Sequence, residues 1–285
     1  MEKSAKKIAY CGRIGSFSHE AAISMFENAQ YFTQYLPFNT FAQAIDSVHN
    51  GNSHFAVIPI ENSTAGRVAE IHNILPEMNL LIVKEKILPI SHNFYSHNSE
   101  VKIENIKFVE SHPQALMQCS NFIAKINAQE IQALNTAIAA ENLAKSGNVE
   151  TAVICSKIAG EHYGLNLLAK NIQNKNNNYT TFIAVGKNQI EANFQNPITC
   201  VIFKLGNETG GIYNALGCFA KNGVNLLKLE SYIPTGIEIN EAQFFVIFEG
   251  DNSQAKVQKS LEELRSVTSE IRNFGSYNGD AKRFY

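Results

Sequence analysis

Two successive patterns of apolar runs and helix-like segments constrain the fold of this chain more than any other feature. Through the first two thirds, short apolar runs such as residues 8–11, 55–58 and 152–154 alternate with helical patterns such as residues 41–48, 114–126 and 136–145. Strands that alternate with helices of this length are typical of βαβ units in a largely parallel sheet. Ligand sites in such sheets lie beyond the carboxyl ends of the strands. We therefore expect an α/β fold whose functional residues lie in the segments that follow its strands.

A second pattern follows a polar stretch at residues 187–196, which we interpret as a linker. Beyond it the order is βαββαβ, which is that of a ferredoxin-like unit. The strands are expected at residues 199–205, 224–230, 244–248 and 271–274, and the helices at residues 212–220 and 254–264. All eight histidines precede residue 163. Because this unit lacks the side chain most often used in acid–base catalysis, we expect it to have a binding or regulatory role.

The composition argues against several classes of protein. With 24 Lys and Arg against 26 Asp and Glu, the net charge of -2 is not that of a nucleic-acid binder that neutralises phosphates. No apolar run approaches the roughly 20 residues of a membrane span, and the charged start does not resemble a signal peptide. The five cysteines are widely spaced and form no CxxC pair. We therefore expect reduced thiols, no metal site and a cytoplasmic location.

Three polar segments lie where expected strands end or begin. In residues 12–18, two glycines and two serines precede a helix, an arrangement that serves as a helix cap or as an anion site. Residues 59–68 combine Glu, Asn, Ser and Thr with Gly and Arg, more polar groups than one helix cap requires. Residues 178–182 begin a strand with two threonines, which β-propensity alone explains. Spacing by itself leaves the roles of all three segments open.

Taken in order, these segments resemble those of the prephenate dehydratase family, followed by its regulatory ACT domain. Residues 12–18 resemble the family's G-P-x-G-T-F-S opening, residues 57–66 its V-P-I-E-N-S-x-x-G signature, and residues 178–182 the segment that ends in N-x-T-R-F. Residues 88–92 and 111–119 match two further family stretches. In the second unit, residues 210–213 resemble the G-A-L-V-type motif and residues 222–231 the approach to E-S-R-P. The resemblance extends from about residue 7 to residue 275.

The resemblance implies a type II periplasmic-binding-protein-like catalytic domain of two α/β lobes at residues 1–190, with the site in the cleft, and a ferredoxin-like ACT domain at residues 197–277. The implied reaction converts prephenate to phenylpyruvate, CO2 and water in L-phenylalanine biosynthesis, with no metal or organic cofactor. L-phenylalanine is the implied allosteric inhibitor, and the implied assembly is a homodimer or homotetramer.

The same resemblance implies roles for individual residues. Thr180 would be the catalytic residue and donate toward the leaving hydroxyl. The substrate-binding set would be Arg13, Ser16, Asn62, Ser63, Thr64, Gly66, Thr181 and Phe182. The phenylalanine-binding set would be Gly210, Gly211, Ile212, Asn225, Leu226, Glu230 and Ser231.

The sequence departs from the family pattern at cationic positions. Thr181 stands where T-R-F has arginine, and residues 232–233 interrupt E-S-R-P with Tyr and Ile. Arg13 replaces a proline, whereas Ser16 replaces a threonine and keeps the hydroxyl. Of the five arginines, only Arg13 and Arg67 precede residue 250, and both lie in polar segments assigned to the cleft. Our hypothesis is that Arg13, on the opposite cleft wall, partly replaces the cation that is missing at position 181.

Three other functions are compatible with parts of the sequence. Arogenate, which has an amino group where prephenate has a ketone, is an alternative substrate. A non-catalytic binding protein for amino acids or small acids would use the same fold, although the missing leader and the Thr180 motif count against it. A catalytically inactive ACT regulator is the third alternative, and Thr181 is its main support.

Overall fold

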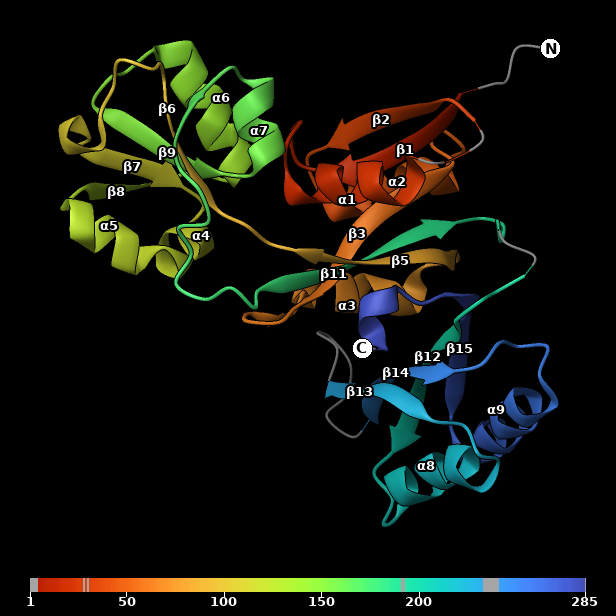
Figure 1. Ribbon diagram of the computed structural model, residues 1–285. Coiled ribbons are helices and arrows are strands. Elements are labelled where there is room, and N and C mark those ends of the chain that lie inside the picture. The colour runs from red at the N-terminus through yellow and green to blue at the C-terminus, as the bar shows by residue number, and fades with distance from the viewer. Residues whose placement is uncertain (1–4, 28, 30, 191–192, 233–240, 285) are drawn as a thin grey trace.

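The structure, a computed structural model, describes residues 5–27, 29, 31–190, 193–232 and 241–284 (Figure 1). These residues form three β-sheets, two in the N-terminal part of the chain and one in the C-terminal part. Each sheet packs against its own helices, so that Figure 1 shows two N-terminal lobes and a C-terminal domain below the first lobe. None of the described helices is long and apolar enough to cross a membrane.

The first lobe contains a sheet with the strand order β2-β1-β3-β11-β5, and the short strand β4 pairs with β3. Its strands are β1 (Lys6–Cys11), β2 (Thr33–Phe38), β3 (Phe55–Asn62), β4 (Gly66–Arg67), β5 (Leu81–Pro89) and β11 (Tyr179–Gly186). Its helices are α1 (Phe17–Phe26), α2 (Phe41–His49), α3 (Ala69–Ile74) and the 3-10 turn η1 (Leu75–Glu77).

The second lobe contains a sheet with the strand order β10-β6-β9-β7-β8. Its strands are β6 (Asn93–Ser96), β7 (Phe108–Ser111), β8 (Gln129–Gln132), β9 (Thr151–Cys155) and β10 (Asn166–Ala169). Its helices are η2 (Ile103–Asn105), α4 (Pro113–Gln118), α5 (Ser120–Ile126), α6 (Thr136–Ser146) and α7 (Lys157–His162).

Both lobes have mixed sheets, so the expectation of a largely parallel sheet is wrong. In the first lobe β1 runs parallel to β2 and β3, but β11 runs antiparallel to β3 and β5. The reason is that β11 does not follow a βαβ crossover, because the chain returns to this lobe from the second one. The two interlobe connections lie side by side, with Ile90 N donating to Asn178 O at 2.9 Å and Ile172 N donating to His92 O at 2.9 Å.

Two expected elements have different bounds in the structure. Strand β3 continues through Pro59 to Asn62 instead of stopping at the proline. Pro59 has no N–H to donate, and it lies where the register between β3 and β11 shifts, a position at which a sheet tolerates proline. The helix expected at residues 114–126 is divided at Cys119 into α4 and α5.

The C-terminal domain confirms the βαββαβ order. Its antiparallel strands have the order β13-β14-β12-β15, and helices α8 and α9 pack against one face of the sheet. The other face packs against the first lobe, where Ile198, Phe245 and Tyr277 share a buried cluster with Ile58 and Ile60. The elements are β12 (Pro197–Gly206), α8 (Gly211–Lys221), β13 (Leu226–Tyr232), β14 (Glu241–Glu249), α9 (Ala255–Val267) and β15 (Glu270–Asn278).

A short C-terminal segment fastens this domain to strand β5. It contains the 3-10 turn η3 (Ala281–Arg283). Arg283 donates from Nε and Nη2 to the two carboxylate oxygens of Glu85, at 2.8 and 2.6 Å. The Glu85 side chain is fully buried, and Asp280 accepts a hydrogen bond from Ile87 N at 3.1 Å. The contact between the C-terminal domain and the first lobe therefore combines a buried apolar cluster with ion pairs, of which Glu85–Arg283 is the most buried.

Candidate active site

A cleft of about 800 Å3 lies at the junction of the two lobes, on the side where β3 and β11 meet the interlobe connections. This volume is ordinary for a small-molecule site. Phe17, Phe41 and Phe182 contribute aromatic surface to it. Its polar lining includes Arg13, Ser16, Ser18, Asn39, Asn62, Glu70, His92, His112, Gln114, Gln118, Asn135, Thr136, Asn178 and Thr180.

Thr180 lies at the start of β11, next to Asn62 at the end of β3. Asn62 Nδ2 donates to Thr180 Oγ1 at 2.9 Å. The threonine oxygen therefore accepts one hydrogen bond, and its own O–H is available to a molecule in the cleft. The sequence places these residues far apart, and the antiparallel pairing of β3 with β11 brings them together.

Asn62 and Thr180 belong to a chain of amides that connects the lobes. Asn62 Nδ2 also donates to Asn178 Oδ1 at 2.7 Å, and Asn178 Nδ2 donates to Gln118 Oε1 at 3.0 Å. Gln118 Nε2 donates to Thr64 Oγ1 at 3.1 Å, which links α4 of the second lobe to the first lobe. Because each amide is held through both its oxygen and its nitrogen, the orientation of Asn62 toward Thr180 is fixed.

Two histidines line the same region in neutral form. His92 is buried, and its Nε2 lies 2.8 Å from Gln118 Oε1. Since a carbonyl oxygen only accepts, His92 Nε2 carries the proton. His112 caps α4, with Gln114 N donating to its Nδ1 at 3.2 Å, so its Nε2 also carries the proton. Burial lowers the pKa of both imidazoles.

Three helices begin at the cleft. Ser16 caps α1 by accepting from His19 N at 3.3 Å, and Asn135 caps α6 by accepting from Ile138 N at 2.8 Å. His112 caps α4 between them, and residues from all three N-termini line the cleft. Helix N-termini carry a partial positive charge, and their first N–H groups have no partner within the helix. Helix α4 is the exception among the three, because Pro113 has no N–H and the Gln114 and Ala115 amides already donate to His112. The cleft therefore has a favourable field for an anion although Arg13 is the one arginine among its described lining residues.

Arg13 extends from the first lobe toward the second. Its Nε lies 3.8 Å from Glu141 on α6, and its side chain is about half exposed. Nearby, Ser156 at the start of α7 donates to Gly15 O at 2.6 Å. A Cβ on Gly15 would lie 2.4 Å from Ala159 Cα, so glycine is required where the lobes touch. The opening turn of the sequence therefore forms both a wall of the cleft and a contact between the lobes.

The structure divides the expected catalytic and substrate-binding residues into two groups. Arg13, Ser16, Asn62, Thr180 and Phe182 line the cleft. The residues outside its lining are Ser63, Thr64, Gly66 and Thr181. Ser63 Oγ accepts from Tyr179 N at 2.9 Å and donates to Asn177 O at 3.1 Å, and thereby joins β3 to the start of β11. Gly66, with φ of 79°, is the first residue of β4, directly after the turn at residues 63–65.

Thr181 lies on the other face of β11, because successive side chains of a strand point to opposite faces. Its cross-strand partners are Glu61 and Ile87, and it is buried away from the cleft. Arg13 therefore does not occupy the position that a cation at 181 would have, and the geometry gives our compensation hypothesis no support. Arg67 also lies outside the lining of the cleft, and its Nη1 is 3.9 Å from Glu230 of the C-terminal domain.

The expected effector residues lie in different parts of the C-terminal domain. Gly211 and Ile212 line a hollow of about 280 Å3 between β12 and α8, and Gly210 with φ of 81° caps that helix. Asn225 Nδ2 donates to Glu249 Oε1 at 3.1 Å, and Leu226 packs against the domain core. Glu230 faces Arg67 of the first lobe, whereas Ser231 is exposed. Ile233 and Pro234, which continue the unusual motif, lie outside the described residues.

The sequence did not single out Gln118, Asn178 or His92. All three lie in segments that resemble family stretches, at residues 88–92, 111–119 and 178–182. Their importance depends on the contact between lobes, which no local pattern encodes. In the described part of the chain, no group of three His, Cys, Asp or Glu side chains is placed to hold a metal ion.

Comparison with known proteins is consistent with this geometry. The family model for prephenate dehydratase matches residues 8–190. The chain belongs to the prephenate dehydratase family. It is 32% identical over 276 residues to a bifunctional chorismate mutase/prephenate dehydratase of Aquifex aeolicus, covering 95% of this chain and 73% of that protein. It is 33% identical to arogenate dehydratase/prephenate dehydratase 1 of Arabidopsis thaliana, covering 99% of this chain and 74% of that protein.

A solved structure extends the likeness to both parts of the molecule. A prephenate dehydratase from Arthrobacter aurescens, determined in complex with L-Phe, superposes with a TM-score of 0.86 at 25% identity. The match covers 97% of this chain and 91% of that one. These relatives favour an enzyme over the binding-protein and inactive-regulator alternatives.

Proposed function

We propose that the cleft converts prephenate to phenylpyruvate. The observation that carries the proposal is the Asn62–Thr180 hydrogen bond in a cleft at which helices α1 and α6 begin. Prephenate is a dianion, and the N-termini with Arg13 can hold its side-chain carboxylate without further arginines. This explains how a chain with few arginines can take such a substrate.

Each step of the reaction has a group suited to it. The bond from the ring to its carboxylate breaks, CO2 leaves, and the bonding electrons complete the aromatic ring. The 4-hydroxyl departs as water after it receives a proton. Thr180 Oγ1 is held by Asn62 and donates a hydrogen bond toward that hydroxyl. Phe17 and Phe182 supply apolar surface that leaves the departing carboxylate poorly solvated.

Replacing Thr180 tests this assignment. We expect Thr180→Ala to lower kcat about a hundredfold or more, with a much smaller change in KM, because the bond is made mainly in the transition state. Thr180→Ser keeps the hydroxyl and should recover most of the activity. Phenylpyruvate formation from prephenate measures both. If Thr180→Ala kept wild-type kcat and KM, Thr180 would have no catalytic role.

The amino analogue arogenate belongs in the same assay. One relative carries both dehydratase names, and the lining contains Glu70 as well as Arg13. The ratio of kcat/KM for the two substrates, read from phenylpyruvate and phenylalanine formation, decides the preference. Turnover of neither would reject the proposed function.

We further propose that residues 1–190 are the catalytic domain, of the periplasmic-binding-protein type, and that residues 197–277 are an ACT domain that binds L-phenylalanine and inhibits the enzyme. The hollow beside Gly211 and Ile212 and the L-Phe complex of the Arthrobacter relative support this. A homodimer or homotetramer and a cytoplasmic location are part of the same proposal, and all five cysteines are free thiols. Calorimetry with L-phenylalanine, and L-alanine as control, tests the effector; absence of heat with both would reject it.

A further inference from the structure

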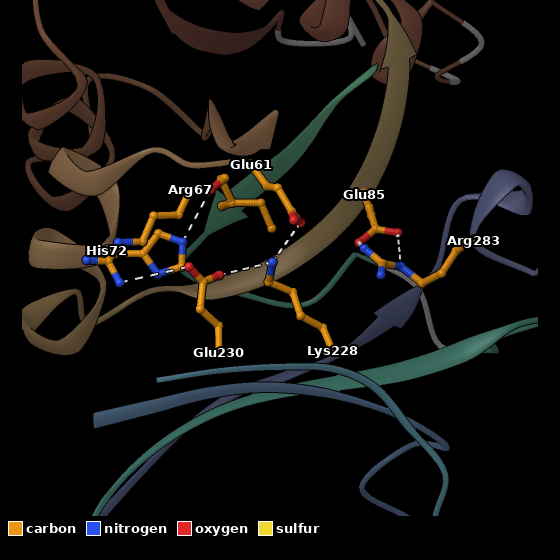
Figure 2. Close-up of polar contacts among 8 residues, drawn as sticks. Glu61, Arg67, His72, Glu85, Lys228, Glu230 and Arg283 are labelled. Carbon is orange, nitrogen blue, oxygen red and sulfur yellow. Dashed lines mark hydrogen bonds and ion pairs between the residues drawn. The ribbon is translucent and has the colours of Figure 1, made fainter. Parts of the chain in front are cut away.

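The end of strand β3 has a different chemistry on each of its faces. Asn62 points to the cleft and holds Thr180. Glu61, one residue earlier, points to the C-terminal domain, where Lys228 Nζ of β13 lies 2.7 Å from Glu61 Oε2 (Figure 2). The Lys228 side chain is only 13% exposed, so solvent screens this pair less than an ordinary surface pair. A charge of the C-terminal domain is thus bound to the residue next to Asn62.

Lys228 belongs to a row of alternating charges between the domains. Its Nζ also lies 3.0 Å from Glu230 Oε2, and Glu230 Oε1 lies 3.9 Å from Arg67 Nη1 (Figure 2). Arg67 lies beside Glu61 again, because the two residues are cross-strand partners in the pairing of β4 with β3. The Arg67 guanidinium also lies 5.3 Å from the centre of the Tyr232 ring. We call Glu61, Arg67, Lys228 and Glu230 the interdomain charge row.

A buried histidine attaches the same strand to the C-terminal domain. His72 of α3 donates from Nε2 to Ile60 O at 3.2 Å (Figure 2). Its ring meets Tyr232 and Phe245 edge-on, with centroid distances of 5.4 and 5.1 Å. The hydrogen bond holds the backbone immediately before Glu61 and Asn62, and the ring contacts hold His72 against the C-terminal domain. The position of the end of β3 therefore depends on how the C-terminal domain is seated.

Position 181 explains why the cation comes from another domain. Thr181 is the cross-strand partner of Glu61 on β11, and residues so paired have side chains on the same face within reach of one another. An arginine there could meet the Glu61 carboxylate from the same lobe, whereas the threonine brings no charge. In the described structure Lys228 supplies that charge.

We propose that Lys228 is a positioning residue for the cleft, which holds Glu61 and thereby sets the Asn62–Thr180 pair, and that this contact transmits the state of the C-terminal domain to the cleft. The proposal rests on the proposed function for its kinetic readout. It requires no new contact between Lys228 and substrate. Movement of β13 would change the Glu61 contact and displace Asn62 through one residue of backbone.

The test compares Lys228→Met with Lys204→Met. Lys204 is a matched control, because it lies in the same domain, is similarly buried at 18% exposure and is ion-paired with Glu270. We expect Lys228→Met to lower kcat about tenfold with less than about a threefold change in KM, and to weaken inhibition by L-phenylalanine, because the charge-assisted contact to Glu61 is lost. Lys204→Met should stay within about twofold of wild type.

Adding Thr181→Arg to Lys228→Met separates the positioning of Glu61 from the transmission of the state of the C-terminal domain. The new arginine provides Glu61 with a cation from its own lobe, so kcat should recover to within about threefold of wild type. Inhibition by L-phenylalanine should stay weak, because this cation has no link to Glu230. Lys228→Arg, which keeps the charge, should retain both properties and guards against a folding defect in Lys228→Met.

Hydrogen exchange at the Thr64 and Ala65 amides gives a readout that needs no turnover. Both amides donate to Asn62 Oδ1, at 3.0 and 2.9 Å. We expect faster exchange there in Lys228→Met and not in Lys204→Met. If the wild type converted neither prephenate nor arogenate, but Lys228→Met still showed this faster exchange, the proposed function would be rejected and the positioning role supported. Wild-type kinetics, inhibition and exchange in Lys228→Met would overturn the proposal.

Discussion

The two faces of strands β3 and β11 differ in charge. On the cleft face, Asn62 and Thr180 form a neutral pair that continues into the amides of Asn178 and Gln118. On the opposite face, Glu61 meets Lys228 of the C-terminal domain. Side-chain alternation separates the two environments by one residue along the chain. The hydrogen-bonding groups of the cleft thus lie one residue from the charges that attach the second domain.

The domain-facing side itself has two kinds of ion pair. The interdomain charge row is partly exposed, with side-chain exposures of 35% for Glu61 and 37% for Arg67. The Glu85–Arg283 pair is bidentate, and its carboxylate is completely buried. A buried pair is costly to break, whereas a partly exposed one adapts at less cost. We therefore assign anchoring to Glu85–Arg283 and adjustable coupling to the charge row.

Removing Arg283 is expected to have the largest effect of the changes considered. Arg283→Met leaves the Glu85 carboxylate buried without its cation, which costs about 3–5 kcal/mol of unfolding free energy. Urea unfolding measures the loss. The double variant Glu85→Gln/Arg283→Met is the control, because it removes both charges and should be less destabilised than the single variant. Equal losses in the two would contradict the role of an unpaired buried charge.

A charge placed on the cleft face should damage activity more than stability. Gln118→Glu keeps an acceptor for Asn178 and His92 but loses the N–H that donates to Thr64, and it adds a negative charge where a dianion binds. We expect kcat/KM to fall about 10- to 100-fold, mainly through KM, from like-charge repulsion in a partly buried site. Gln132→Glu, exposed on β8 of the same lobe, is the control and should remain near wild type. Equal effects of both substitutions would show that the cleft has no special sensitivity to charge.

Much of the fold could be predicted because it depends on local periodicity. The βαββαβ order of the C-terminal domain and the helix that starts at Thr136 follow from apolar spacing and caps. Strand partners do not: nothing in residues 179–186 indicates that they pair antiparallel with β3 and β5 instead of continuing a parallel sheet. The register shift between β3 and β11 that lets β3 continue through Pro59 also depends on a distant strand, so it could not be predicted from local sequence.

The site shows the same division between local and distant information. The family-like segments gave Thr180 and Asn62, which the structure places 2.9 Å apart. The resemblance also placed Thr181 in the substrate-binding set, although strand alternation already implies that its side chain faces the other way. Gln118 and His92 act through bonds to each other and to residues of the interlobe connections, so only the folded chain reveals their role.

Buried histidines on the two faces should make stability depend on pH. Burial lowers the pKa of both His72 and His92 from the ordinary value of 6.5, and for His72 Lys228 and Arg67 act in the same direction while Glu230 opposes them. The unfolded chain therefore binds more protons below pH 6.5, and stability falls as the pH decreases. Each histidine contributes a slope of up to about 1.4 kcal/mol per pH unit.

Thermal and urea unfolding between pH 5 and pH 7 check this dependence. His72→Gln keeps an N–H donor for Ile60 O but does not titrate in this range. We expect its stability to fall less steeply with decreasing pH than that of the wild type. An unchanged slope would mean that His72 is not held neutral by the C-terminal domain.

The smallest effect is expected for an ion pair that belongs to neither face. Lys107 and Glu150 pair in the second lobe, with side-chain exposures of 65% and 46%. Water screens such a pair, so Lys107→Met should cost less than about 0.5 kcal/mol and leave kcat unchanged. Urea unfolding and the prephenate assay, applied to Lys107→Met and to Lys228→Met, compare the loss of one lysine charge at an exposed position with its loss at a buried position. If Lys107→Met lowered kcat as much as Lys228→Met, the effect would follow from net charge, and the contact with Glu61 would not be its cause.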